Sequence, residues 1–122
     1  MNIVCVDDHP IFLKGLEKNI HQIMPEASIH TFESADKALD FVKDGSCDIL
    51  ISEIEMQGMS GLTLARNIKN LNPEVNIIFL TVCDESEYAR EVFDIRPSGY
   101  LLKPADEAQL AFELKNLRYR AG

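Results

Sequence analysis

The sequence predicts an α/β domain in which a five-stranded parallel sheet is covered by helices on both faces. Short apolar runs alternate five times with segments whose apolar residues recur every three or four positions, as in amphipathic helices. The runs are largely continuous rather than alternating with polar residues, which is typical of strands buried on both faces. Repeated βα units of this length indicate a parallel sheet with helices on both sides.

The first unit begins with the apolar run Asn2–Val6, which predicts a strand. Pro10 follows, and proline suits the first position of a helix. Apolar residues then recur at spacings of four, four and three, on one helix face: Phe12, Leu16, Ile20 and Ile23. Pro25 is expected to stop this helix.

The second unit begins with a short predicted strand, Ser28–Phe32. Ser34 is a plausible N-cap for the helix that follows, and Gly45 marks its C-terminal end. The inward face of this helix is predicted to hold Ala35, Ala38, Leu39 and Val42. The third strand is expected at about Asp48–Ser52.

The remaining units follow the same pattern. Gly61 begins a helix that ends before Asn72-Pro73, with Leu64, Ala65, Ile68 and Leu71 inward. Asn76–Leu80 is the fourth predicted strand, and Asp84–Ile95 is a helix whose face is Tyr88 or Ala89, Val92 and Phe93. Gly99–Leu102 is the fifth strand. From Ala105 onward a last helix has Leu110, Leu114 and Leu117 inward.

Composition limits the classes of protein that the chain can belong to. A length of 122 residues with 46% hydrophobic residues suits one globular domain. No apolar run approaches the roughly 20 residues of a membrane span, and the first residues lack the pattern of a signal peptide. Three cysteines without metal-type spacing favour a reducing cytoplasm. A net charge of −8 argues against nucleic-acid binding by this chain and suits a cationic partner or a divalent cation.

Polar residues follow four of the predicted strands at the point where each strand ends. Asp7 and Asp8 follow the first strand, Glu53 the third, Thr81 the fourth and Lys103 the fifth. Ligands of open α/β sheets bind outside the carboxyl ends of the strands. We therefore expect these side chains to form one site.

The chemistry of this set is coherent. Three carboxylates packed together repel one another unless a cation or a proton intervenes. Magnesium prefers oxygen ligands and commonly takes one or two carboxylates together with a phosphate oxygen. A lysine and a threonine can both bind phosphoryl oxygens, and a carboxylate beside a metal can form an acyl phosphate. The set therefore predicts magnesium-dependent phosphoryl chemistry.

Over nearly all of its length the chain resembles the receiver domain of two-component response regulators. The resemblance rests on VDDHP (6–10), DILISEIEMQGMSG (48–61), IIFLT (77–81) and SGYLLKP (98–104). It implies a doubly wound, flavodoxin-like α/β/α fold with strand order 2-1-3-4-5. It also implies that a histidine kinase or another phosphodonor passes a phosphoryl group to an aspartate at the end of the third strand, with magnesium required.

The resemblance also implies roles for individual residues. Asp8 would bind magnesium directly, Asp7 through water, and Glu55 through its backbone carbonyl. Thr81 and Lys103 would hold the phosphoryl oxygens, Tyr100 would be the aromatic switch that turns inward when Thr81 moves, and the Lys103–Pro104 bond would be cis. Partners, often a second receiver, would meet the face made by the fourth helix, fifth strand and fifth helix.

The sequence departs from the family pattern at the phosphoacceptor position, which is Glu53. One extra methylene moves the carboxylate by roughly 1.5 Å, and a misplacement of ~1 Å can cost on the order of a hundredfold in rate. Glu53 is therefore a poor acceptor, but it could approach the cation or reach toward Thr81 and Lys103. Val82 replaces a usually small residue, and Gln57 replaces a usual proline. Together these departures favour a naturally atypical receiver or a deliberate Asp-to-Glu substitution in a slightly unusual one. His9 is expected to be solvated rather than a metal ligand.

Two other functions remain open at this point. A magnesium-dependent phosphohydrolase or phosphotransferase could use Asp7 or Asp8 as its nucleophile, although the short loops leave little room for a substrate pocket. A flavodoxin-like flavin-binding domain would need a Gly/Ser/Thr-rich loop after the first strand, where this chain has Asp-Asp-His-Pro. We expect residues 1–122 to be a receiver domain from the N-terminal part of a longer regulator, with a linker beginning near Arg118.

Overall fold

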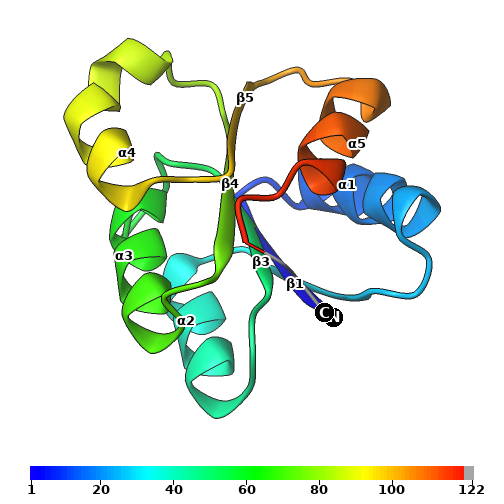
Figure 1. The fold of residues 1–122 in the computed structure, drawn as a ribbon, viewed down its shortest axis with the longest axis horizontal. Helices are drawn as coiled ribbons and strands as arrows, with labels where there is room; N and C mark the ends of the chain where they lie inside the picture. The colour runs from blue at the N-terminus through cyan, green and yellow to red at the C-terminus, as the bar shows by residue number, and fades with distance from the viewer. Residues whose placement is uncertain (120–122) are drawn as a thin grey trace.

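The computed structural model describes residues 1–119 as a single sheet with flanking helices (Figure 1). The elements, in chain order, are β1 (Asn2–Val6), α1 (Pro10–Ile23), β2 (Ser28–Phe32), α2 (Ala35–Asp44), β3 (Ile49–Ser52), α3 (Gly61–Leu71), β4 (Asn76–Thr81), a 3₁₀ turn η1 (Glu85–Tyr88), α4 (Ala89–Ile95), β5 (Gly99–Leu102) and α5 (Glu107–Lys115). The expected linker at 118–122 lies partly outside the described residues, since 120–122 are not among them.

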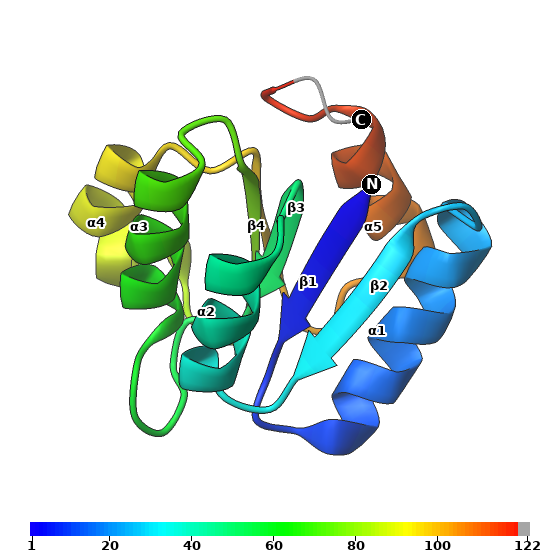
Figure 2. The same cartoon turned by 90° about the horizontal axis from the view of Figure 1, so that it is seen from below.

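All five strands are parallel, in the order β2-β1-β3-β4-β5, as predicted. Helices α1 and α5 cover one face of the sheet, and α2, α3 and α4 cover the other (Figures 1 and 2). The chain order reverses direction across the sheet between β1 and β3, so the carboxyl ends of these neighbouring strands frame a crevice.

The core consists of two apolar layers, one on each face of the sheet. The layer beneath α1 and α5 includes Ile3, Ile51 and Leu80, and the layer beneath the other helices includes Val4, Leu50 and Phe79. Successive strand residues point to opposite faces, so continuous apolar runs supply both layers. This is the physical reason why the strands could be recognised in the sequence.

The predicted helix over Asp84–Ile95 is wrong in its first half. Asp84 accepts hydrogen bonds from both the backbone N–H and the hydroxyl of Ser86, at 2.9 and 2.8 Å, and caps a 3₁₀ turn instead of an α-helix. The α-helical segment α4 begins only at Ala89. Within α4 the core-facing residues are Val92 and Ile95, and Phe93, which was predicted to face the core, is 76% exposed.

The last helix is shorter than the predicted one. It begins at Glu107 because Asp106 and Gln109 form a reciprocal capping box, in which each side chain accepts from the backbone N–H of the other. It ends at Lys115, so Leu117 packs against the core from the segment after the helix. Within residues 1–119, no helix is long and apolar enough to cross a membrane.

Candidate functional site

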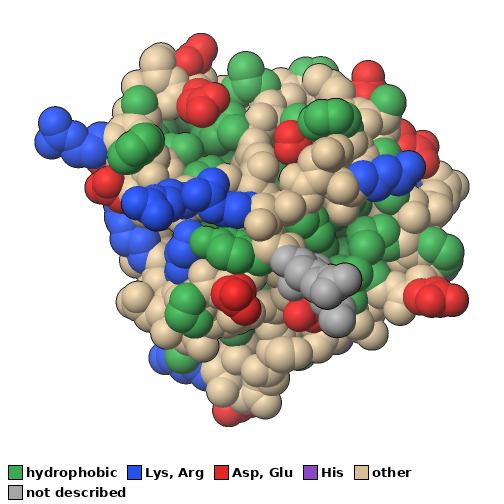
Figure 3. Space-filling view, in the orientation of Figure 1, with side chains coloured by type: hydrophobic (Ala, Val, Ile, Leu, Met, Phe, Trp, Pro, Cys, Tyr) green, Lys and Arg blue, Asp and Glu red, His purple; other side chains and the backbone are tan. Residues whose placement is uncertain are grey.

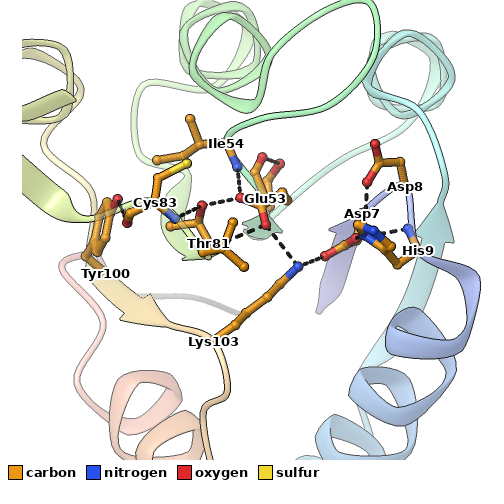
Figure 4. A network of polar contacts seen from close by, with 11 residues as sticks. Asp7, Asp8, His9, Glu53, Ile54, Thr81, Cys83, Tyr100 and Lys103 are labelled. Carbon is orange, nitrogen blue, oxygen red and sulfur yellow. Dashed lines mark hydrogen bonds and ion pairs between the residues drawn. The ribbon is translucent and has the colours of Figure 1, made fainter. Parts of the chain in front are cut away.

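The polar residues at the strand ends meet at one edge of the sheet, as the sequence predicted (Figure 4). Their backbones continue the sheet hydrogen bonding beyond the strands. The N–H of Asp7 donates to Phe32 of β2, that of Glu53 to Val6 of β1, and that of Lys103 to Thr81 of β4, at 2.8 to 3.1 Å. The sheet itself therefore holds these residues in register.

Lys103 lies between two buried carboxylates. Its Nζ is 2.5 Å from Oδ2 of Asp7 and 2.9 Å from Oε1 of Glu53, and both acidic side chains are 3% exposed or less. Burial alone would lower the pKa of Lys103, but the hydrogen bonds and charges of Asp7 and Glu53 outweigh it, so the pKa lies above its ordinary value. The lysine is therefore a fixed cation at the centre of the site.

The carboxylate of Glu53 is held by donors on several sides. The Thr81 hydroxyl donates to Oε2, and the N–H of Ile54 donates to the same oxygen at 2.7 Å. The N–H of Val82 lies 3.4 Å from Oε1, the oxygen that also contacts Lys103. Glu53 therefore turns toward Thr81 and Lys103, one of the two directions expected from the sequence. The bulk of Val82 does not block it, because that side chain is largely exposed.

Tyr100 points into the molecule from β5. Its hydroxyl donates to the carbonyl of Cys83 at 2.7 Å, and its ring packs against Phe79 with the centroids 6.1 Å apart. The Cys83 N–H donates in turn to the Thr81 hydroxyl at 3.0 Å. Burial raises the pKa of Tyr100, so the hydroxyl stays a donor. A continuous chain of contacts thus joins Glu53, Thr81, Cys83 and Tyr100 (Figure 4).

The acid pair after β1 forms the other half of the site. Ligand atoms of Asp7, Asp8 and His9 lie within 4.8 Å of one another. Oδ1 of Asp8 is buried and accepts no well-aligned hydrogen bond in the described part of the chain, although Nδ1 of His9 lies 3.1 Å away. A buried carboxylate oxygen without a well-aligned donor, beside a second carboxylate, fits a hard cation such as Mg²⁺, so these residues suit the metal that the sequence predicted.

His9 was expected to be solvated, but its ring lies close to the carboxylates of Asp7 and Asp8. The ring is 73% exposed, but its Nδ1 lies 3.0 Å from Asp7 and 3.1 Å from Asp8. The His9 backbone N–H also donates to Asp7 at 3.0 Å. The histidine therefore borders the acid pair while most of its ring faces solvent.

The loop after β3 passes close to the start of α3. The N–H of Gly61 donates to the carbonyl of Ile54 at 2.8 Å, and a Cβ at residue 61 would lie only 1.9 Å from the carbonyl oxygen of Glu53. Only glycine permits this approach, which fixes the backbone beside the site. The Glu55 side chain points away, where it accepts from the Tyr88 hydroxyl at 2.5 Å and thereby raises the pKa of Tyr88 to about 12.

Two contributors were not identified as site residues from the sequence. The Nζ of Lys103 lies 4.2 Å from the centre of the Phe12 ring, a cation–π contact, although Phe12 was assigned only to a helix face. Cys83 was counted only as one of the three cysteines, but its backbone connects Thr81 to Tyr100. Burial raises the pKa of that thiol, so it is not activated. The position of Phe12, in the first turn of a helix that starts at this edge, was the available signal.

Comparison with known proteins agrees with this geometry. A family model described as "Response regulator receiver domain" matches residues 3–115. The transcriptional regulatory protein NatR of Bacillus subtilis is 34% identical over 110 residues, which are 88% of this chain and 46% of NatR. The transcriptional regulatory protein RcsB of Escherichia coli is 30% identical over 121 residues, which are 97% of this chain and 56% of RcsB.

Solved structures show the same fold. RcsB from Salmonella enterica serovar Typhimurium, bound to the promoter rprA in the presence of the phosphomimetic BeF₃⁻, matches with a TM-score of 0.81 and 30% identity. The match covers 97% of this chain and 68% of that one. A receiver domain protein from Clostridium thermocellum has a TM-score of 0.84 at 23% identity, covering 94% and 91% of the two chains. The chain spans about half the length of the curated relatives it matches.

Proposed function

The chain belongs to the response regulator receiver domain family of two-component signalling, and on that premise we propose that it is an atypical receiver whose Glu53 carboxylate stands in for a phosphoryl group. Glu53 would occupy the position of the phosphoaccepting aspartate. Because receiver domains are signalling domains rather than classical enzymes, the phosphohydrolase alternative has no support. The proposal concerns how this receiver is activated.

One observation carries the proposal: the Glu53 carboxylate is bonded by the residues expected to hold phosphoryl oxygens. The Thr81 hydroxyl and the Lys103 ammonium both contact it. Tyr100 is turned inward and anchored on Cys83, which is bonded to Thr81. A carboxylate with its extra methylene therefore reaches the donors that a phosphorylated aspartate would use, and the aromatic switch takes its inward position without phosphorylation.

Magnesium would be held by Asp7 and Asp8, with the backbone carbonyl of Glu55 as a further ligand. The ion supplies a charge that offsets the acidic cluster and, in a phosphorylatable receiver, would polarise the phosphoryl group. Glu53 was also expected as a ligand. Here its two oxygens accept from Thr81, Ile54 and Lys103, which leaves Asp8 as the more available carboxylate.

Phosphodonor labelling tests the proposal. The chain and its Glu53→Asp variant would each be incubated with acetyl phosphate and Mg²⁺, and phosphoryl incorporation would be measured by intact mass. We expect no stable incorporation in the chain with Glu53, because the carboxylate is too long and already bonded by its donors. The aspartate variant should gain one phosphoryl group per chain, if Val82 leaves room for it.

A Glu53→Asp, Val82→Ala variant resolves the steric contribution of Val82. Labelling of this double variant but not of the single one would assign the block to the valine. Glu53→Gln serves as a matched control, since it keeps the length of the side chain and cannot form an acyl phosphate. Stoichiometric labelling of the unsubstituted chain on Glu53 would contradict the proposal.

The signalling face is proposed to be that of α4, β5 and α5. One large apolar side chain is exposed on each of these elements: Phe93, Leu102 and Phe112, at 76%, 49% and 63% exposure. Figure 3 shows hydrophobic side chains exposed over α4 and α5. Exposed apolar residues that gather on adjoining elements are typical of a protein-binding surface, which supports pairing with a second receiver or with an output domain.

Analytical ultracentrifugation tests this surface. Phe112→Ser should weaken self-association of the chain, because the exposed ring is the largest apolar group that α5 presents. Leu71, which was predicted to point inward, is instead 53% exposed on α3, so Leu71→Ser is the matched control. An equal effect of both substitutions would show that general hydrophobicity, and not this face, drives association. The histidine kinase, the output domain and a cytoplasmic location belong to the same proposal and rest on family membership.

A further inference from the structure

The segment that follows α5 is bound at the end of the sheet opposite the acidic site. Residues 116–119 turn back toward the N-terminal ends of the strands, as Figure 2 shows for the stretch after α5. There they reach Asn76, the first residue of β4, and Ser98, just before β5. None of these residues takes part in the site described above.

Asn76 binds the main chain of Tyr119 through both ends of its side-chain amide. Its Oδ1 accepts from the N–H of Tyr119 at 2.7 Å, and its Nδ2 donates to the carbonyl of Tyr119 at 2.9 Å. The two main-chain groups fix which end of the amide is oxygen and which is nitrogen. The amide thus pairs with residue 119 as a neighbouring strand would.

Ser98 extends this contact by one residue. Its hydroxyl donates to Oδ1 of Asn76 at 2.8 Å and accepts from the N–H of Arg118 at 3.1 Å. The Ser98 backbone N–H donates to Ile77 of β4 at 2.7 Å. Two adjacent backbone N–H groups of the segment and one carbonyl are therefore satisfied by side chains from two different places in the sheet.

The side-chain amide of Asn76 is neither hydrated nor required for the hydrogen bonding of β4. Asn76 is 1% exposed and lies among apolar strand residues, where a polar side chain without partners would be costly. Its backbone N–H is already bonded to the carbonyl of Asp48 at 3.0 Å. The contacts of its side-chain amide are with Ser98 and Tyr119, so binding the segment is the role that the described structure gives it.

Lys69 adds a contact from α3. Its Nζ donates to the carbonyl of Ile95 at the end of α4 and lies 5.7 Å from the centre of the Tyr119 ring. The side chain of Tyr119 thus has one distant cationic neighbour, whereas its main chain has two short hydrogen bonds. The clip therefore recognises the main chain of residue 119 more than its tyrosine side chain.

We propose that Asn76 and Ser98 form a clip that binds main-chain groups, that its occupant is the chain's own residues 118–119, and that the clip fixes the path by which the polypeptide leaves the domain. Because Ser98 lies in the connection between α4 and β5, the exit segment is tied to that connection as well as to β4. A shift of the connection would then be transmitted to the exit segment.

Amide hydrogen exchange, measured by NMR on the complete ¹⁵N-labelled chain, tests the clip. The Tyr119 amide should be protected relative to an unstructured peptide. Asn76→Ala should raise its exchange rate roughly 10- to 100-fold, the effect of losing two hydrogen bonds of ordinary net strength, while the amides of β3 keep their rates. Ser98→Ala should release the Arg118 amide by a smaller factor, on the order of fivefold.

Two control variants separate the clip from general loosening. Asn72→Ala removes a side-chain amide at the same end of the sheet, where Nδ2 donates to the carbonyl of Cys47 at 3.2 Å, and it should leave the Tyr119 amide unchanged. Tyr119→Ala should keep the residue 119 amide protected, since the clip binds main chain.

The proposal is overturned if the Tyr119 amide exchanges at the peptide rate in the unsubstituted chain, or if Asn76→Ala and Asn72→Ala have equal effects. If Asn76→Ala lowers protection throughout the domain, Ser98→Ala decides the matter, because it leaves the buried amide in place. Unchanged exchange of Arg118 in that variant would then reject the clip.

Discussion

Replacement of Thr81 by valine should destabilise the domain strongly. The Thr81 side chain has no exposed surface, and its hydroxyl both donates to Glu53 and accepts from the N–H of Cys83 at 3.0 Å. Valine has nearly the same shape as threonine, so the substitution creates no large cavity. The change therefore isolates the hydrogen bonding of one buried hydroxyl.

The magnitude follows from the two bonds that are lost. A hydrogen bond to a charged group contributes about 1.5–3 kcal/mol, and a buried N–H left without a partner costs about 1–3 kcal/mol. The expected loss is therefore about 2.5–6 kcal/mol. Small domains have unfolding free energies of about 5–15 kcal/mol, so the variant should lose a large share of its stability.

Urea denaturation measures this loss as a change in the transition midpoint at constant slope. Thr63→Val is the matched control, because Thr63 is exposed on α3 and its substitution should change stability by less than about 0.5 kcal/mol. A double-mutant cycle with Glu53→Gln should give a coupling of about 0.5–3 kcal/mol, as expected for residues in contact. A loss below about 1 kcal/mol for Thr81→Val would refute the reasoning.

Three further predictions concern charge and pH. Lys103→Met should lower the unfolding free energy by about 3–5 kcal/mol, because it leaves two buried carboxylates without their cation; a loss under about 1 kcal/mol in urea denaturation would contradict this. Mg²⁺ at roughly a hundred times its dissociation constant should stabilise the chain by about 2.7 kcal/mol, measured by thermal denaturation. Asp8→Ala should remove this stabilisation. Asp40→Ala, a substitution on the exposed surface of α2, should retain it. Burial raises the pKa of Cys5, and raises that of Cys47 to about 12. Both thiols ionise near pH 8.5 in the unfolded chain, so their contribution to stability is complete below that pH and declines above it by up to about 1.4 kcal/mol per pH unit for each thiol. Replacing both cysteines by alanine should flatten this alkaline decline, and identical slopes for the two proteins would reject the assignment.

The sequence predicted the sheet well because its signal is local and repeated. Runs such as Asn2–Val6 and Asn76–Leu80 are largely apolar on both faces, and only a sheet covered on both sides can bury them. The same regularity placed Asp7, Thr81 and Lys103 at strand ends, and parallel strands bring such ends to one edge. The fold and the position of the site could thus be predicted from the spacing of apolar residues and from the repeated strand–helix connections.

Local rules failed where a single side chain competes with the backbone pattern. The spacing from Asp84 onward is helical, but the Asp84 carboxylate bonds to Ser86 and begins a 3₁₀ turn. The α-helix then begins only at Ala89, and Phe93 is exposed on the proposed signalling face while Val92 and Ile95 are buried. Nothing in the apolar spacing distinguishes the two outcomes, because it describes which residues can be buried and not which hydrogen bonds form.

By itself, the sequence determined the five βα units, the edge at which the polar residues gather, and the acidic and basic groups available there. The tertiary structure decided the direction of the Glu53 carboxylate, the inward position of Tyr100, and the binding of Tyr119 by Asn76 across 43 residues. The physical reason is the distance along the chain over which each interaction acts. Hydrophobic periodicity acts within a few residues, whereas these contacts exist only after the packed sheet and helices have brought distant backbone and side-chain groups within hydrogen-bonding distance.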